Sequence, residues 1–113
     1  MIVIAEGLFM YFNKQENQKI LHNLTEMFSH GTLVVELMRQ SMMKENIHDT
    51  VKETQAKFGW GTKSSHEFEL LEPKMKWIRE RSFALQLLKS SWISKCIGLC
   101  SLKINNRIAV FVW

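Results

Sequence analysis

The stretch that decides the fold stands at the start of the chain: Ile2-Val3-Ile4-Ala5-Glu6-Gly7-Leu8-Phe9-Met10-Tyr11-Phe12. Its first four residues are apolar and stop at a carboxylate and a glycine, which predicts a short strand buried on both faces. In open α/β sheets, ligands bind outside the carboxyl ends of the strands. Two roles are therefore open for Glu6: a ligand-facing carboxylate that binds a cationic group, or a carboxylate near the free N–H groups of a helix start.

A helix and a second strand follow this stretch. Asn13 and Glu16 have the spacing of a capping box, and apolar residues recur at helical intervals, so a helix is predicted over residues 14–29. Gly31 suits a left-handed residue that ends this helix. Residues 32–38 are rich in β-branched side chains and predict a central strand, parallel to the first. Glu36 is the lone charge in this second strand, and it lies at the same sheet edge as Glu6.

The remainder of the chain continues the alternation of helices and strands. Ser65 suits the cap of a short helical turn, and the charged run Arg79-Glu80-Arg81 suits a strand at the edge of a sheet. The predicted elements are a helix over 41–58, a helical turn over 65–71, a strand over 74–83, a helical stripe from Ala84 to Cys96, and a closing strand over 107–113 that is apolar on both faces. This order predicts an α/β fold with a largely parallel sheet.

Bulk composition narrows the class of protein. The 113 residues suit one domain, and the net charge of +4 is scattered without the basic stripe and interleaved aromatics of a nucleic-acid-binding surface. No apolar run approaches the ~20 residues that cross a bilayer. No two histidines have helical metal-ligand spacing, so no metal site is expected. The two cysteines, Cys96 and Cys100, and the lack of a signal peptide favour a reducing, cytoplasmic setting.

Residues 4–12 resemble the signature "AEG-hydrophobic-hydrophobic-M-Y" of the leucine carboxyl methyltransferase and TcmP-like O-methyltransferase family. These are class I S-adenosylmethionine-dependent methyltransferases. Residues 56–61, Ala-Lys-Phe-Gly-Trp-Gly, more loosely resemble the "F-x-W-G" loop of the family, and residues 107–113 resemble its closing antiparallel strand.

The resemblance implies a particular piece of a larger sheet. Class I methyltransferases have the strand order 3-2-1-4-5-7-6 with strand 7 antiparallel, and residues 1–113 would form a single partial domain with the strands 4-5-7-6. The glycine-rich loop after strand 1 and the acidic residue after strand 2, which hold the cofactor in the family, have no counterpart here. Strand 4 would then lack its neighbour, so the segment Ile2–Ala5 is expected to be an unpaired edge through which copies of the chain associate.

The resemblance also implies roles for individual residues. Glu6 and Gly7 would lie against S-adenosylmethionine, and Tyr11, Phe58 and Trp60 would line the substrate pocket. The chain is thus expected to be a truncated O-methyltransferase with little activity alone. In the full-length family, the acceptor is a carboxylate or hydroxyl of a small molecule or a protein. Two alternatives stay open: a non-enzymatic interaction module, and one half of a two-chain enzyme.

Overall fold

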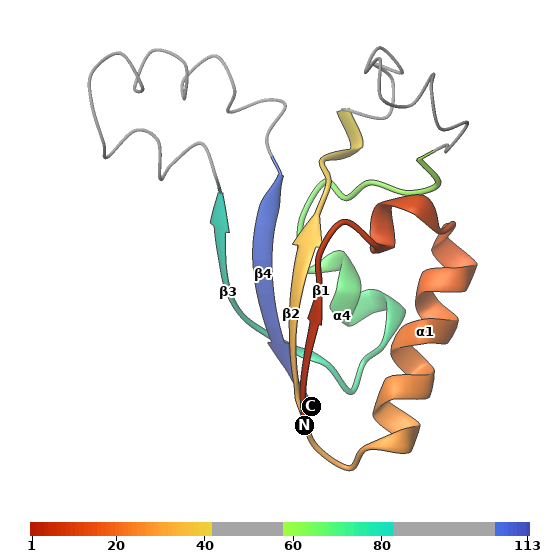
Figure 1. Ribbon diagram of the computed structural model, residues 1–113, viewed down its shortest axis with the longest axis vertical. Helices are drawn as coiled ribbons and strands as arrows, with labels where there is room; N and C mark the ends of the chain where they lie inside the picture. The colour runs from red at the N-terminus through yellow and green to blue at the C-terminus, as the bar shows by residue number, and fades with distance from the viewer. Residues whose placement is uncertain (42–57, 83–105) are drawn as a thin grey trace.

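The computed structural model describes residues 1–41, 58–82 and 106–113 (Figure 1). The helix predicted over 41–58 lies outside the described residues except at its two end positions, and so do the helical stripe from Ala84 to Cys96 and both cysteines. The described elements in chain order are β1 (Ile2–Ala5), the 3-10 helix η1 (Phe9–Tyr11), α1 (Lys14–Met27), β2 (Thr32–Leu37), α4 (Glu67–Leu71), β3 (Lys76–Ser82) and β4 (Arg107–Val112).

The strands form one four-stranded sheet in the order β1-β2-β4-β3. Strands β1 and β2 are parallel, as the helical crossover between them predicts, whereas β4 is antiparallel to both β2 and β3. The molecule is therefore a mixed α/β domain. The largely parallel sheet predicted from the alternation of elements is wrong, because only one of the three strand pairs is parallel. The expectation that the last strand is antiparallel is confirmed.

The capping box predicted at the start of α1 is present. The Asn13 side chain accepts from the Glu16 N–H at 2.8 Å, and the Glu16 carboxylate accepts from the Asn13 N–H at 2.8 Å. Two of the four N–H groups that a helix start leaves free are thereby satisfied. The helix ends at Met27, two residues before the predicted end, with the Phe28 N–H bonded to the Leu24 carbonyl.

Gly31 is needed for a different reason from the one predicted. Among the described glycines only Gly7 has a positive φ, so Gly31 is not a left-handed residue that ends the helix. Instead, Gly31 exchanges two backbone hydrogen bonds with Trp113, and a Cβ at this position would stand 2.4 Å from the Trp113 ring. The indole N–H donates to the Phe28 carbonyl at 2.8 Å, which fixes the ring over the connection between α1 and β2.

One face of the sheet carries the core. Helices α1 and α4 lie on the same side of the strands (Figure 1), and the alternate residues of β2 and β4 that point toward them are buried. The core on this side includes Phe9, Leu21, Leu33, Val35, Leu37, Phe68, Leu71, Met75, Ala109 and Phe111. Rings of Phe68 and Phe111 stack with centroids 5.1 Å apart.

The opposite face, called here the open face, is not covered by any helix among the described residues. Ile2 is 71% exposed, Ile4 75% and Ile108 36%. The prediction that β1 is buried on both faces is therefore wrong, and the apolar residues on both faces of the closing strand do not make both faces equally buried. A strand that is apolar on both faces can be buried on both faces only if elements from elsewhere in the chain cover each face, and its own sequence does not show whether they do.

A buried asparagine joins η1 to α1. Asn17 is fully buried, and its side-chain amide donates to the Phe9 carbonyl at 2.9 Å and to the Phe12 carbonyl at 3.4 Å. These carbonyls belong to the short segment between the Gly7 turn and α1, which has few backbone partners of its own. Asn17 therefore fixes the path of the chain from β1 into the helix.

We expect Asn17→Ala to lower the free energy of unfolding by about 1–3 kcal/mol, because it leaves a buried carbonyl without a donor. The matched control is Gln18→Ala, at the next and exposed position of α1, which should change stability by less than about 0.5 kcal/mol. Urea unfolding followed by tryptophan fluorescence measures both. Equal losses for the two variants would contradict the role given to Asn17.

Candidate functional site

The turn after β1 is built on a glycine. Gly7 has φ +57°, in the left-handed region that other residues rarely adopt, and this conformation turns the chain from β1 toward η1. The Gly7 N–H donates to Glu36 Oε2 at 2.9 Å. This amide is therefore already engaged within the protein and is not free to bind a ligand.

Glu36 lies at the carboxyl end of β2 and holds the turn in place. While Oε2 accepts from Gly7, Oε1 accepts from the Asn106 side-chain amide at 2.7 Å. Asn106 immediately precedes β4, so one carboxylate connects the ends of three neighbouring strands. The sequence predicted that Glu36 and Glu6 share a sheet edge, and the structure places them beside one hollow at that edge.

Glu6 has a different environment from Glu36. Its side chain is exposed, and it makes no hydrogen bond or ion pair with the part of the chain that the structure describes. It borders a hollow of about 110 Å³, which is lined by Ile4, Ala5, Glu6, Val34, Val35, Glu36 and Ile108. A free carboxylate above an apolar floor can accept hydrogen bonds from a hydroxyl or an ammonium group. The hollow is smaller than the roughly 300–1,000 Å³ of drug-sized ligand sites, so it fits only part of such a ligand.

The three aromatic residues expected in a substrate pocket separate into two groups. The Tyr11 and Phe58 rings lie together, with centroids 5.4 Å apart, and Tyr11 is 46% exposed. Trp60 instead packs at the margin of the core, 5.4 Å from the Phe68 ring. The structure thus brings Tyr11 and Phe58 together, and it packs the partly buried Trp60 against the margin of the hydrophobic core.

The Phe58–Gly61 loop is held close to η1 by the backbone. The N–H groups of Gly59 and Trp60 both donate to the Met10 carbonyl, at 2.8 and 3.3 Å. A Cβ on Gly59 would stand 2.7 Å from the backbone of Phe12, which cannot move aside as a side chain could. Glycine is therefore required for this close approach, and the approach is what places Phe58 beside Tyr11.

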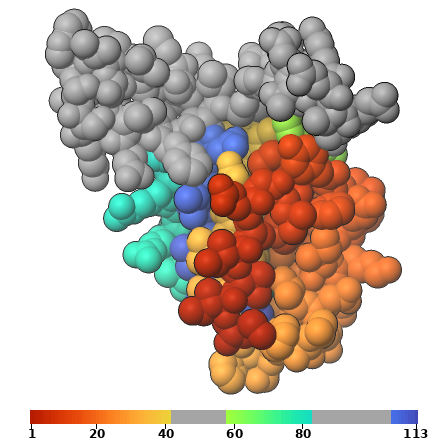
Figure 2. All heavy atoms as spheres, in the orientation of Figure 1, coloured from red at the N-terminus to blue at the C-terminus, as the bar shows by residue number. Residues whose placement is uncertain are grey.

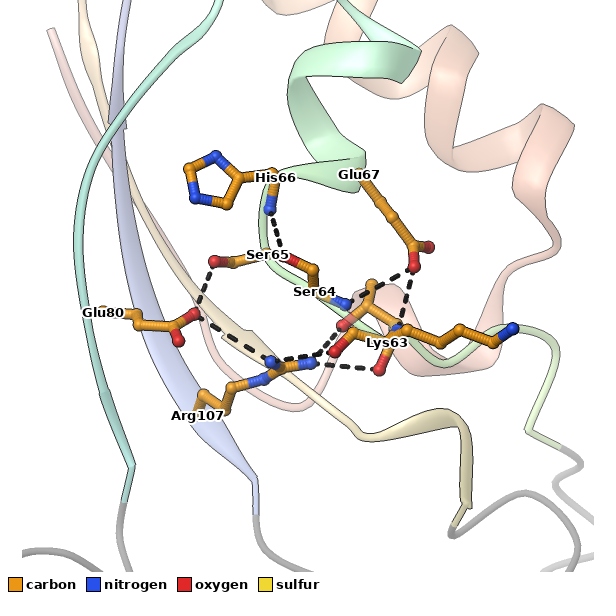
Figure 3. Close-up of polar contacts among 8 residues, drawn as sticks. Lys63, Ser64, Ser65, His66, Glu67, Glu80 and Arg107 are labelled. Atoms are coloured by element: carbon orange, nitrogen blue, oxygen red, sulfur yellow. Dashed lines mark hydrogen bonds and ion pairs between the residues drawn. The ribbon is translucent and has the colours of Figure 1, made fainter.

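A buried arginine forms a second polar cluster that sequence reasoning did not find (Figure 3). Arg107 opens β4 and is 5% exposed. Its Nη2 donates to the carbonyl and hydroxyl oxygens of Thr62, at 3.0 and 2.9 Å, and its Nη1 donates to the Lys63 carbonyl at 3.3 Å. The signal in the sequence was a single charge at the start of an otherwise apolar strand, which marks a cation with a specific partner.

Glu80 and Ser65 complete this cluster. The Glu80 carboxylate lies 4.0 Å from Arg107 Nη1, and it accepts the Ser65 hydroxyl (Figure 3). The prediction that Ser65 caps the short helix α4 is wrong, because its hydroxyl is used by Glu80 on β3. Glu67, the first residue of α4, accepts the N–H groups of Lys63 and Ser64 at 2.9 and 3.4 Å, which fixes the segment before the helix but does not cap it.

Burial lowers the pKa of the Arg107 guanidinium from its ordinary value, and the Glu80 carboxylate partly opposes this shift. Three of its hydrogen bonds go to Thr62 and Lys63, in the segment that leads into α4. Arg107 therefore holds this segment against the sheet, and we assign it a structural role.

Several comparisons and searches give no match. Neither a scan of protein-family models nor a search of curated proteins finds a match for this chain. Among residues 1–41, 58–82 and 106–113, no cluster of three or more histidine, cysteine, aspartate or glutamate side chains could hold a metal ion. Within the same ranges, no helix combines the length and apolar character needed to cross a membrane.

The double role of Glu36 can be tested by two substitutions. Glu36→Ala should lower the free energy of unfolding by about 1–3 kcal/mol, because the Gly7 N–H and the Asn106 amide lose their acceptor. Glu36→Gln should cost less than about 1 kcal/mol. The glutamine keeps an oxygen for Gly7, and its NH₂ can donate to Asn106 Oδ1 once the Asn106 amide turns by about 180° so that this oxygen replaces Nδ2.

Chemical denaturation at neutral pH distinguishes the two substitutions. If glutamine destabilises the chain as strongly as alanine does, the negative charge of Glu36 matters and the hydrogen-bond account is wrong.

Proposed function

We propose that this chain is the carboxyl-terminal half of a class I methyltransferase sheet and that the edge at Glu6 contacts S-adenosylmethionine. The observation that carries the proposal is the strand order β1-β2-β4-β3 with β4 antiparallel. It matches the 4-5-7-6 order of that fold. The methyltransferase-like signature at residues 4–12 runs from the end of β1 through the Gly7 turn and η1, and β1 would be strand 4 in this proposal.

The residues at this edge fit part of the cofactor. Glu6 is exposed and has no partner in the described ranges, so its carboxylate is available to accept from a cofactor hydroxyl or amino group. The Gly7–Glu36 hydrogen bond fixes the turn that carries Glu6. The paired rings of Tyr11 and Phe58 would form a wall that keeps water from the acceptor. When bound, S-adenosylmethionine supplies the methyl group as an electrophile on a positively charged sulfur.

These 113 residues alone are expected to bind the cofactor weakly. They contain no counterpart of the family's glycine-rich loop after strand 1 or of its acidic residue after strand 2. The hollow beside Glu6 has a volume of only about 110 Å³. Methyl transfer also requires an acceptor oxygen aligned with the sulfonium carbon, and the described residues supply only one side of such a pocket. We therefore propose little or no methyl transfer by this chain alone. In a complete sheet of this fold, the acceptor would be a carboxylate or hydroxyl group.

A second candidate is a non-enzymatic interaction module or one half of a two-chain enzyme. The observation that favours it is strand β1, which has β2 on one side and no described strand on the other. A strand with one free edge can bind a strand from another chain.

The cofactor contact can be tested by amide NMR of the 113-residue chain with S-adenosylmethionine at millimolar concentration. We expect shifts confined to Glu6, Gly7 and their neighbours, and loss of these shifts in Glu6→Gln. The control is Glu26→Gln, on the exposed face of α1, which should leave the shifts unchanged. Shifts elsewhere only, or none, would contradict the site. Micromolar affinity by calorimetry would contradict the expectation of an incomplete site.

A further inference from the structure

The two edges of the sheet are built differently. The outer strand β3 carries the exposed residues Arg79, Glu80 and Arg81, and its pairing with β4 is irregular between Trp77 and Arg79. Charges and bulges are the usual devices by which an edge strand avoids pairing with another chain. The other outer strand, β1, reads Ile-Val-Ile-Ala and has no charge, no proline and a regular register with β2.

The free hydrogen-bonding groups of β1 can be identified. The Thr32 N–H donates to the Met1 carbonyl, so the carbonyl of Met1 points toward β2. Because successive residues of a strand direct their N–H and C=O groups to opposite sides, Val3 and Ala5 also face β2. The N–H and C=O groups of Ile2 and Ile4 therefore point out from the sheet. Figure 2 shows β1 (red) lying along the surface of the molecule with no other described segment over it in this view.

We propose that two copies of this chain pair through β1, antiparallel, about a two-fold axis at Val3. In this register Ile2 lies opposite Ile4 of the second copy, and Ile4 lies opposite Ile2 of the second copy. Each of these two pairs exchanges two N–H···O=C hydrogen bonds, which uses every outward-pointing backbone group of Ile2 and Ile4. The two sheets join into one sheet of eight strands.

The side chains agree with this register. Ile2 and Ile4 both project from the open face, where they are 71% and 75% exposed. Pairing about Val3 keeps residue parity, so the four isoleucines of the two copies meet on the same face of the joined sheet. Cross-strand pairs of β-branched residues stabilise antiparallel strands. A shift of one residue would turn the second copy over, so that its isoleucines lie on the opposite face of the joined sheet. The isoleucines of the two copies would then not contact one another and would stay in water.

The charges also permit pairing between identical strands. No ionisable side chain lies within Ile2–Ala5. The nearest is Glu6, three residues from the axis, so the two copies of Glu6 stand roughly 20 Å apart along the strand direction, at ~3.3 Å per residue. This separation exceeds the ~8 Å screening length at physiological salt, so repulsion between the two carboxylates is small.

The same contrast between edges predicts where assembly stops. When β1 pairs with its copy, the β1 edge of each molecule is covered. The outer strands of the joined sheet are then the two β3 strands, which carry charges and an irregular register. An isologous contact of this kind closes on itself. The inference therefore specifies a dimer and excludes filaments, and it does not depend on the proposed methyltransferase function.

The oligomeric state of the 113-residue chain tests the proposal by sedimentation equilibrium over a range of micromolar concentrations. We expect a monomer–dimer equilibrium. Ile4→Lys should raise the dissociation constant about tenfold or more, since it places a charge in the paired strand. The matched control is Ile78→Lys, at an isoleucine of β3 that is 49% exposed, and it should leave the constant unchanged. Thermal unfolding of each variant verifies that it is folded.

Amide hydrogen exchange on the unmodified chain gives a second, independent readout. The N–H groups of Ile2 and Ile4 should be protected at high protein concentration and exchange when it is diluted, whereas Val3 and Ala5 should be protected at both. A monomer at all concentrations, species larger than a dimer, equal effects of Ile4→Lys and Ile78→Lys, or unprotected Ile2 and Ile4 in the dimer would each overturn the proposal. Concentration-dependent protection with the Ile4→Lys effect would support it.

Discussion

The Glu36 carboxylate connects the ends of three strands, and the geometry of the candidate site depends on it. One oxygen receives the Gly7 N–H, and the other receives the Asn106 amide. The left-handed turn at Gly7 is therefore fixed by a residue 29 positions along the chain. Because this turn sets the position of Glu6, the doubly hydrogen-bonded Glu36 positions a carboxylate that has no partner among the residues the structure describes. Glu36 therefore has a structural role, whereas the Glu6 carboxylate is available to a ligand.

Local sequence signals predicted much of the fold. The capping box at Asn13, the helix after it, the parallel β1–β2 pair and the edge position of β3 all follow from short-range rules and agree with the structure. The errors arose where distant residues decide. An apolar strand has the same composition with or without a second layer, so the exposure of Ile4 was not predictable from β1 itself. Gly31 resembles a helix stop, but its need for glycine comes from Trp113.

The candidate site was predictable only in outline. The shared edge of Glu6 and Glu36 follows from parallel strands having their carboxyl ends on one side, whereas the partners of Glu36 required the structure. Arg107 and Thr62 are 45 positions apart, and no local pattern connects them. Trp60 shows a further limit, since an aromatic residue in a loop suits both a pocket wall and the edge of a core, and its side chain packs against the core beside Phe68.

Because one face of the sheet is covered and the other is open, folding stability and solubility depend on different side chains of the same strands. Side chains that point toward α1 and α4 are buried and contribute to folding stability, whereas Ile2 and Ile4 on the open face remain largely in water. Replacing Ile2 and Ile4 with threonine should leave the stability of the folded monomer nearly unchanged, because little apolar surface is lost from the core. The same replacements remove exposed apolar surface, which favours association and precipitation of proteins in general. Solubility and thermal stability are thus controlled from opposite faces of one sheet.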